Sequence, residues 1–138
     1  MNKKYFTSWV IVFVVWMIGS FMVHAIFIKA DYMQVPNLFR TNEESQKYFP
    51  LMIFAHILMS GAFVCIYSNG AVNKSWLGQG IRYGGAIALL MIVPNYLINY
   101  VVQPFPLVII GKQIIFDGVL QLLLGLVVAF LYRNQKIT

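Results

Sequence analysis

Charged residues are scarce in this chain of 138 residues: only 10% are Asp, Glu, Lys or Arg, whereas 60% are hydrophobic. A soluble domain carries about 25% charged residues. A surface that faces water on every side cannot be built from this composition, so part of the surface must face lipid. The length allows one transmembrane domain, residues 1–138, and no separate soluble module.

Cysteine and acidic residues are also rare. The single cysteine, Cys65, lies in an apolar stretch, so no disulfide can form within the chain and two-cysteine redox chemistry is excluded. Four acidic residues stand against ten Lys and Arg, a net charge of +6. In a soluble protein this excess would suggest nucleic acid. Here membrane topology accounts for it, because Lys and Arg collect in cytoplasmic loops, and we expect no nucleic-acid partner.

Four long apolar segments account for most of the chain, each close to the roughly 20 residues that cross the hydrocarbon core. They cover residues 8–28, 50–68, 81–101 and 107–131. These segments lack the alternation of barrel strands, and helices are the other structure that satisfies its own backbone groups in lipid. The sequence therefore predicts an all-α fold, a bundle of four transmembrane helices.

Basic residues are distributed unequally between the two sides that four spans define. The side formed by both termini and the second loop carries six basic residues and no acidic one: Lys3, Lys4, Lys74, Arg82, Arg133 and Lys136. The other side mixes basic and acidic residues: Lys29, Arg40, Lys47, Lys112, Asp31, Glu43 and Glu44. Because cytoplasmic loops are the basic ones, we expect both termini in the cytoplasm and the protein in a bacterial inner membrane.

The loop between the first and second spans, residues 29–49, is the longest. Thr41 and Glu44 fit a capping box, which marks the start of a helix. This predicts a short extracytoplasmic helix up to Phe49, after which Pro50 kinks the chain or starts the second span. Such a segment is either a lid across the mouth of the bundle or a solvated connector.

Small residues recur at regular spacing in the third and fourth spans. They form one four-residue series and one seven-residue series: Gly80, Gly84 and Ala88, then Gly111, Gly118 and Gly125. Lipid tails are as apolar as leucine, so transmembrane helices associate where small residues let their backbones approach. The two series predict packing faces, either within one chain or between the copies of a homo-oligomer.

Polar side chains inside the spans share one depth. Ionisable residues are costly in the membrane and usually face the bundle interior, and His24, His56 and Asp117 are the clear cases. At a rise of about 1.5 Å per residue, these three and Asn95 fall in the outer half of their spans. Each helix thus brings a polar group to the outer leaflet, and the simplest arrangement is one outward-facing pocket.

The polar faces of the spans supply the candidate site residues. For ligand binding they are His24, His56, Asn95, Tyr96, Asn99, Gln113 and Asp117. For catalysis they are His24, His56 and Asp117, because a carboxylate can orient an imidazole for proton transfer. The two histidines and the aspartate lie on three different spans without the spacing of a metal site, so we expect no metal and no cofactor. Each polar residue has a structural alternative as an interhelical hydrogen bond.

The chain resembles the small four-helix integral membrane proteins of bacteria, a group defined by architecture and not by an activity. The resemblance rests on Gly61, Gly80, Gly84, Pro94, Tyr96, Pro104, Asp117 and Gly125. It implies a four-helix bundle. The chain does not resemble small multidrug transporters, because its first span has no embedded glutamate, and it lacks the cysteine pairs of quinone-linked disulfide formation.

Three function classes follow from the sequence. The first is a protein that binds or transports a small or amphipathic ligand in an outer-leaflet pocket. The second is a membrane enzyme that uses a His/Asp acid–base pair on a lipid-like substrate. The third is an accessory subunit that contacts membrane lipids and has no ligand. A cavity would disfavour the third class, a His–Asp contact facing that cavity would favour the second, and a continuous path through the inner half would favour transport.

The charge distribution predicts that a cysteine at position 138 reacts with thiol reagents only from the cytoplasmic side. The variant is Thr138→Cys in a Cys65→Ala background, labelled in intact cells with a membrane-impermeant maleimide. We expect labelling only after the cells are permeabilised. Labelling in intact cells would show that the orientation is reversed.

Overall fold

A computed structural model describes residues 3–72 and 74–134, and every element assigned within these ranges is helical. Four helical rods are long and apolar enough to cross a membrane: Lys3–Phe27, Asn42–Gly70, Trp76–Val102 and Leu107–Tyr132. They coincide with the four predicted spans and define a multi-pass helical membrane protein. The first three rods begin before the predicted apolar segments, because more polar residues continue each helix at that end.

The first rod and the loop after it form a continuous structure. Helix α1 (Lys3–Met22) passes into a π turn (Val23–Phe27), then a short helix α2 (Lys29–Tyr32) and a 3₁₀ turn (Pro36–Leu38). The loop is folded back on the bundle: Ile28 is fully buried against Val23 and Ile109. Lys112 on the last helix donates to both carboxylate oxygens of Asp31 at 2.7 and 2.8 Å.

Helix α3 (Asn42–Gly70) starts at the predicted capping box: Thr41 accepts from the backbone N–H of Glu44, and Glu44 accepts from the backbone N–H of Thr41. Of the two alternatives predicted for Pro50, a kink and the start of a new helix, the second is wrong, because α3 continues through Pro50 as one helix of 29 residues. The short helix expected up to Phe49 is the first part of α3. Pro50 removes one hydrogen bond, to the carbonyl of Gln46. Gln46 and Pro50 are both exposed, so that carbonyl does not have to be satisfied inside the protein.

The third rod consists of α4 (Trp76–Ile87), a π turn (Ala88–Ile92) and α5 (Val93–Val102), and it packs along the last helix, α6 (Leu107–Tyr132). Their contact is made by glycines. A Cβ on Gly80 would lie 2.9 Å from the carbonyl oxygen of Gly125, and one on Gly84 would lie 2.8 Å from the Cα of Leu122. The two backbones therefore touch directly, and Gly80, Gly84 and Gly125 are used for packing within the chain.

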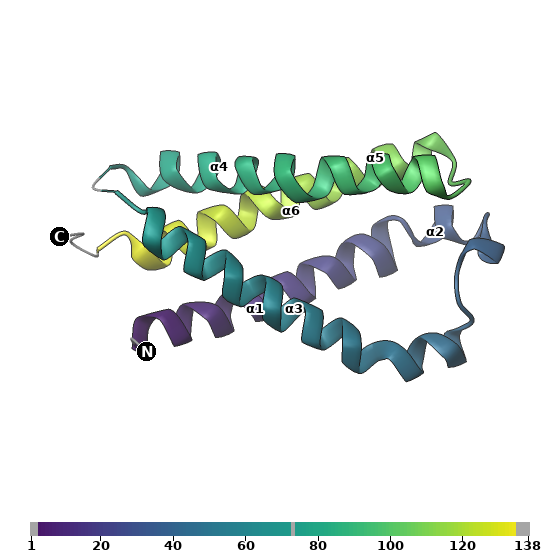
Figure 1. Ribbon diagram of the computed structural model, residues 1–138, viewed down its shortest axis with the longest axis horizontal. Helices are drawn as coiled ribbons and strands as arrows, with labels where there is room; N and C mark the ends of the chain where they lie inside the picture. The colour runs from purple at the N-terminus through teal and green to yellow at the C-terminus, as the bar shows by residue number, and fades with distance from the viewer. Residues whose placement is uncertain (1–2, 73, 135–138) are drawn as a thin grey trace.

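The four rods do not form a closed bundle. The described ends of the chain and the α3–α4 connection lie at one end, and α2 and the α5–α6 turn lie at the other (Figure 1). Helix α1 packs on α3 and α6, whereas α3 makes few contacts with the third rod. The best-packed core lies toward the end with the termini, where Val12, Val64, Leu124 and Val128 are fully buried. Toward the other end, α3 diverges from its neighbours (Figure 1).

We predict that Gly84→Ala destabilises the fold, because the added Cβ would lie 2.5 Å from the carbonyl oxygen of Gln121 and force α4 and α6 apart. The expected cost is about 1–3 kcal/mol. The matched control is Gly118→Ala, where a Cβ meets no atom within 4 Å and should stabilise the helix slightly. The measurement is unfolding in detergent followed by circular dichroism, and equal effects of the two variants would contradict the packing described here.

Candidate functional site

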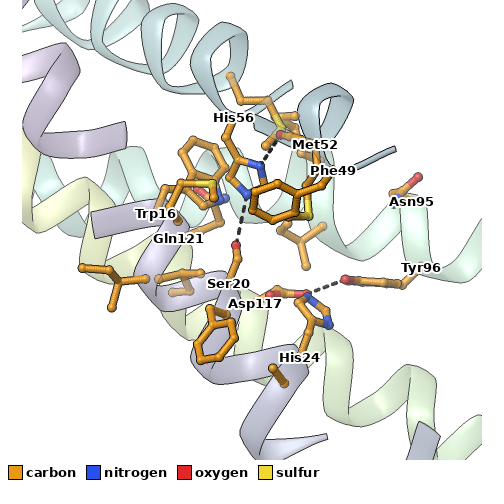
Figure 2. A pocket seen from close by; sticks show the side chains of 18 residues that line it. Trp16, Ser20, His24, Phe49, Met52, His56, Asn95, Tyr96, Asp117 and Gln121 are labelled. Carbon is orange, nitrogen blue, oxygen red and sulfur yellow. Dashed lines mark hydrogen bonds and ion pairs between the residues drawn. The ribbon is translucent and has the colours of Figure 1, made fainter. Parts of the chain in front are cut away.

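A cavity of about 940 Å³ lies between α1, α3, the third rod and α6, toward the end of the bundle opposite the termini (Figure 2). Its polar lining residues come from all four rods: Ser20, His24, His56, Asn95, Tyr96, Asp117 and Gln121. The rest of the lining is apolar and includes four methionines and three aromatic side chains: Met17, Met52, Met59, Met91, Trp16, Phe21 and Phe49. The cavity therefore combines a polar cluster with an apolar wall.

Asp117 is the centre of the polar cluster. It lies on α6 and is only 5% exposed. Its Oδ2 atom accepts a hydrogen bond from the Tyr96 hydroxyl at 2.5 Å and lies 3.3 Å from Nε2 of His24. A carboxylate in a span is stabilised when donors surround it, and these two donors come from the first and third rods. Asp117 thus links three of the four rods (Figure 2).

His24 is connected on its other side to the outer loop. Its Nδ1 atom lies 2.7 Å from the hydroxyl of Tyr32, which also accepts from Nε2 of Gln113 at 3.0 Å. Burial raises the pKa of Tyr32, the Gln113 bond partly opposes this, and the nearby Asp117 and Asp31 carboxylates raise it further. The hydroxyl therefore keeps its proton at neutral pH and can donate it to Nδ1. In that arrangement Nε2 of the neutral imidazole carries the proton that faces Asp117.

His56 has the opposite arrangement. Its Nδ1 atom lies 2.8 Å from the backbone carbonyl of Met52, which can only accept, so Nδ1 must carry a proton. Nε2 of the neutral ring is then an acceptor, 3.4 Å from the hydroxyl of Ser20. Trp16 packs edge-on against the ring and holds its plane. The cavity thus contains two imidazoles whose proton positions differ when both are neutral.

Two π turns lie beside the cavity, one on each of two rods. His24 belongs to the π turn Val23–Phe27, and Met91 and Ile92 belong to the π turn Ala88–Ile92. A π turn inserts a residue into a helix and changes the direction of the side chains that follow, and such turns are common at functional sites. The second π turn ends just before Pro94, which has no N–H to continue the α-helical ladder.

Two buried amide oxygens near the polar cluster have no hydrogen-bond partner within the described part of the chain, Oε1 of Gln113 and Oε1 of Gln121. Gln121 lines the cavity and is 1% exposed. An acceptor buried without a donor costs about 1–3 kcal/mol. Oε1 of Gln121 is itself buried, so a donor from the cavity reaches it only when the side chain turns.

Most of the predicted site residues meet in this cavity. His24, His56, Asn95, Tyr96 and Asp117 all line it, with Asn95 farther from the other four (Figure 2). The remaining two predicted residues have other places. Gln113 contacts Tyr32 next to the cavity and does not line it, and Asn99 lies one turn beyond Asn95, also outside the lining.

Sequence reasoning missed Tyr32 and the apolar wall. Tyr32 lies in the outer loop, outside every span, and no local pattern connects it to His24. The wall residues Met52, Met91 and Phe49 look like any apolar residues that face lipid, and only the tertiary arrangement separates the two environments. Within residues 3–72 and 74–134, no three His, Cys, Asp or Glu side chains lie close enough to hold a metal ion.

The fold and the cavity together define a four-span helical membrane protein with a polar cluster in a largely apolar cavity. Comparison with the profiles of known protein families, with curated proteins and with solved structures finds no match for the chain. The choice between the function classes therefore depends on the geometry of the cavity.

We predict that Tyr32→Phe lowers the free energy of unfolding by about 1–3 kcal/mol, because His24 and Gln113 lose the hydroxyl that they share. The control is Tyr100→Phe, which removes the hydroxyl of an exposed tyrosine and should change the stability by less than about 0.5 kcal/mol. Chemical denaturation in detergent compares the two variants. A Tyr32→Phe protein as stable as the Tyr100→Phe protein would show that the Tyr32 link contributes nothing.

Proposed function

We propose that this protein binds a small amphipathic ligand in the cavity, with the polar end of the ligand at the Asp117 cluster and its apolar part along the methionine and aromatic wall. One observation carries the proposal: a cavity of about 940 Å³ holds both histidines of the chain and Asp117, the only carboxylate within the four predicted apolar segments, residues 8–28, 50–68, 81–101 and 107–131. A purely structural polar layer needs no such space. The accessory-subunit hypothesis is therefore the least supported of the three.

The orientation proposed for the molecule places the cavity in the outer leaflet of a bacterial inner membrane. Lys3, Lys74 and Arg133 lie at the end of the bundle with the described chain ends, whereas Asp31 lies at the end nearer the cavity. Cytoplasmic loops are the basic ones, which supports this orientation. Lys136, also counted on the basic side, lies outside the described residues. The segment that begins at the Thr41 capping box is then extracytoplasmic.

The free acceptors of the cavity indicate the chemistry of the ligand. Oε1 of Gln121 has no donor, and Nε2 of His56 has only a distant partner in Ser20 at 3.4 Å. Asp117 adds a carboxylate that hydroxyl or ammonium donors can approach from the cavity. A ligand with a hydroxyl or amine head satisfies these acceptors, whereas a carboxylate head would be repelled by Asp117. The apolar wall suits an alkyl or ring-containing tail.

Binding is better supported than transport in this conformation. Below the cavity, toward the termini, the core residues Val12, Val64, Leu124 and Val128 are fully buried and packed on one another. None of these four residues lines the cavity, and Trp16 and Leu120 of the same core form its boundary on that side. The cavity is therefore closed on the inner side, as expected for a protein that holds a ligand taken up from one side.

A second candidate function is acid–base catalysis on a lipid-like substrate, and the His24–Asp117 contact at 3.3 Å favours it. Asp117 can hold the imidazole of His24 in position while Tyr32 fixes its proton. His56 offers Nε2, whose partner is the Ser20 hydroxyl at 3.4 Å, as a base across the same cavity. Catalysis requires the bound molecule to be altered chemically, which separates it from simple binding.

The test uses 12-bromododecanol, an alkyl chain with a hydroxyl head and a bromine that quenches tryptophan, added to the protein in lipid nanodiscs. We predict saturable quenching that is lost in Trp16→Phe, because Trp16 lines the cavity. Asp117→Asn should weaken binding about tenfold, the loss of one charge-assisted hydrogen bond. Glu43→Gln, which removes an exposed carboxylate, should bind like the wild type.

The outcomes separate the hypotheses. If Asp117→Asn folds normally and binds the alcohol as tightly as the wild type across pH, Asp117 is structural and both functions lose their main support. If 12-bromododecanoic acid binds as well as the alcohol, the proposed donor head is wrong. Mass spectrometry of the recovered probe, after incubation with the protein, shows whether it has been altered, as the enzyme hypothesis requires.

A further inference from the structure

A separate cavity of about 340 Å³ lies at the opposite end of the bundle, between the last turns of α3 and the first turns of α4. Tyr67 and Tyr83 form part of its wall, and Lys74 and Arg82 supply two positive charges. It shares no lining residue with the large cavity. Nothing in the proposed function uses it.

The charge of this small cavity is not neutralised by the protein. The chain has four acidic residues. Asp117 lines the large cavity, Asp31 pairs with Lys112, and Glu43 and Glu44 belong to the first turn of α3, at its other end. Within the described part of the chain, the side chains of Lys74 and Arg82 form no ion pair. Two cations thus line one cavity without an acidic side chain from residues 3–72 or 74–134.

The loop that carries Lys74 is held in place by Gln79 on α4. The Gln79 amide nitrogen donates to the carbonyls of Val72 and Lys74 at 2.7 and 2.8 Å, and its oxygen accepts from the N–H of Val72 at 3.0 Å. These three hydrogen bonds fold the α3–α4 loop onto the helix. The backbone of Lys74 is therefore attached to the helix that carries Arg82, which reduces the entropy lost when an anion binds.

One face of α3 runs from the small cavity to a third, apolar cavity, which also borders the large cavity at Trp16, Met59 and Met91; the small and apolar cavities and this face are called the groove. The third cavity, of about 260 Å³, lies between α3 and the third rod, lined by apolar residues that include Ala62, Phe63 and Ile87. Ile66 of the cationic cavity and Ala62 of the apolar one are four residues apart on α3, so they share a helix face. Between the two cavities, Tyr83 of α4 donates to the carbonyl of Phe63, so the open path follows the exposed side of α3 formed by Ala62 and Ile66.

We propose that this groove binds an anionic phospholipid from the leaflet on the side of the termini. The phosphate lies between Lys74 and Arg82, where the guanidinium can form paired charge-assisted hydrogen bonds. One acyl chain extends past Ile66 to Ala62 and Ile87. Basic pockets between transmembrane helices are the usual sites for anionic headgroups, and an apolar groove above the phosphate selects a lipid over a free anion.

The experiment is native mass spectrometry of the full chain in detergent, titrated with phosphatidylglycerol and with phosphatidylcholine of identical acyl chains. We expect the wild type to prefer phosphatidylglycerol. The double variant Lys74→Gln/Arg82→Gln should bind it about tenfold more weakly, a loss of the order expected for two basic residues. The control, Lys3→Gln/Arg133→Gln, removes two exposed charges from the same end of the bundle and should keep the preference.

A third variant tests the acyl chain. Ala62→Phe narrows the apolar groove, so it should weaken the binding of both lipids severalfold. The preference for phosphatidylglycerol over phosphatidylcholine should be kept. Equal losses in the two charge variants, or no preference in the wild type, would overturn the proposal. So would a site that millimolar inorganic phosphate empties and that Ala62→Phe leaves unchanged, because such a site recognises a free anion.

Gln79→Ala, which frees the loop, should also reduce the preference for phosphatidylglycerol, whereas an unchanged preference would show that Lys74 needs no positioning.

Discussion

The direct backbone contact between α4 and α6 is the constraint on which the rest of the structure depends. Gly80 and Gly84 bring the first part of the third rod against Gly125 and the backbone near Gln121. In lipid no hydrophobic force drives helices together, so close approach of this kind is what fixes their relative rotation. Once α6 is fixed, residues one turn apart, Gln121 and Asp117, share the face that lines the cavity.

The two halves of the molecule differ in packing because the contact between α4 and α6 lies in only one of them. It occupies the half with the termini, where apolar side chains of α1, α3 and α6 pack closely and the hydroxyls of Tyr5 and Tyr83 donate to backbone carbonyls of α3. In the other half the helices carry polar side chains that must be satisfied, and Tyr96, His24 and Tyr32 do this through hydrogen bonds around Asp117 and Gln113. Hydrogen bonds join side chains across a space that apolar packing would have filled, so the cavity forms there.

The sequence predicted the number of spans, their positions and the meeting of their polar groups, because hydropathy and helical rise are local properties. It also identified Asp117 and both histidines as candidates, since charges inside a span are costly wherever they lie. The residues that pair with these three side chains could not be predicted. Lys112 pairs with Asp31, which only the folding of the outer loop brings near.

Local patterns failed in two other places for physical reasons. A new helix at Pro50 was one of two expectations, but a lost hydrogen bond is tolerated where the helix is exposed. The apolar wall could not be separated from the lipid-facing surface, because Met52 and Met91 line a cavity with the same side-chain chemistry that lipid accepts. Tertiary packing decides which apolar residues a ligand can reach, and the periodicity of one helix contains no information about it.

The exposed first half of α3, residues 42–55, has a mechanical consequence. This arm holds Phe49 and Met52 against one side of the cavity, and the first residue along it that is buried is His56. This part of α3 has no buried residue before His56, so it moves more easily than α4 and α6, whose backbones touch. The width of the apolar part of the cavity can therefore change. The positions around Asp117 are held by hydrogen bonds. Selectivity should therefore be strict for the head of a bound molecule and permissive for the bulk of its tail.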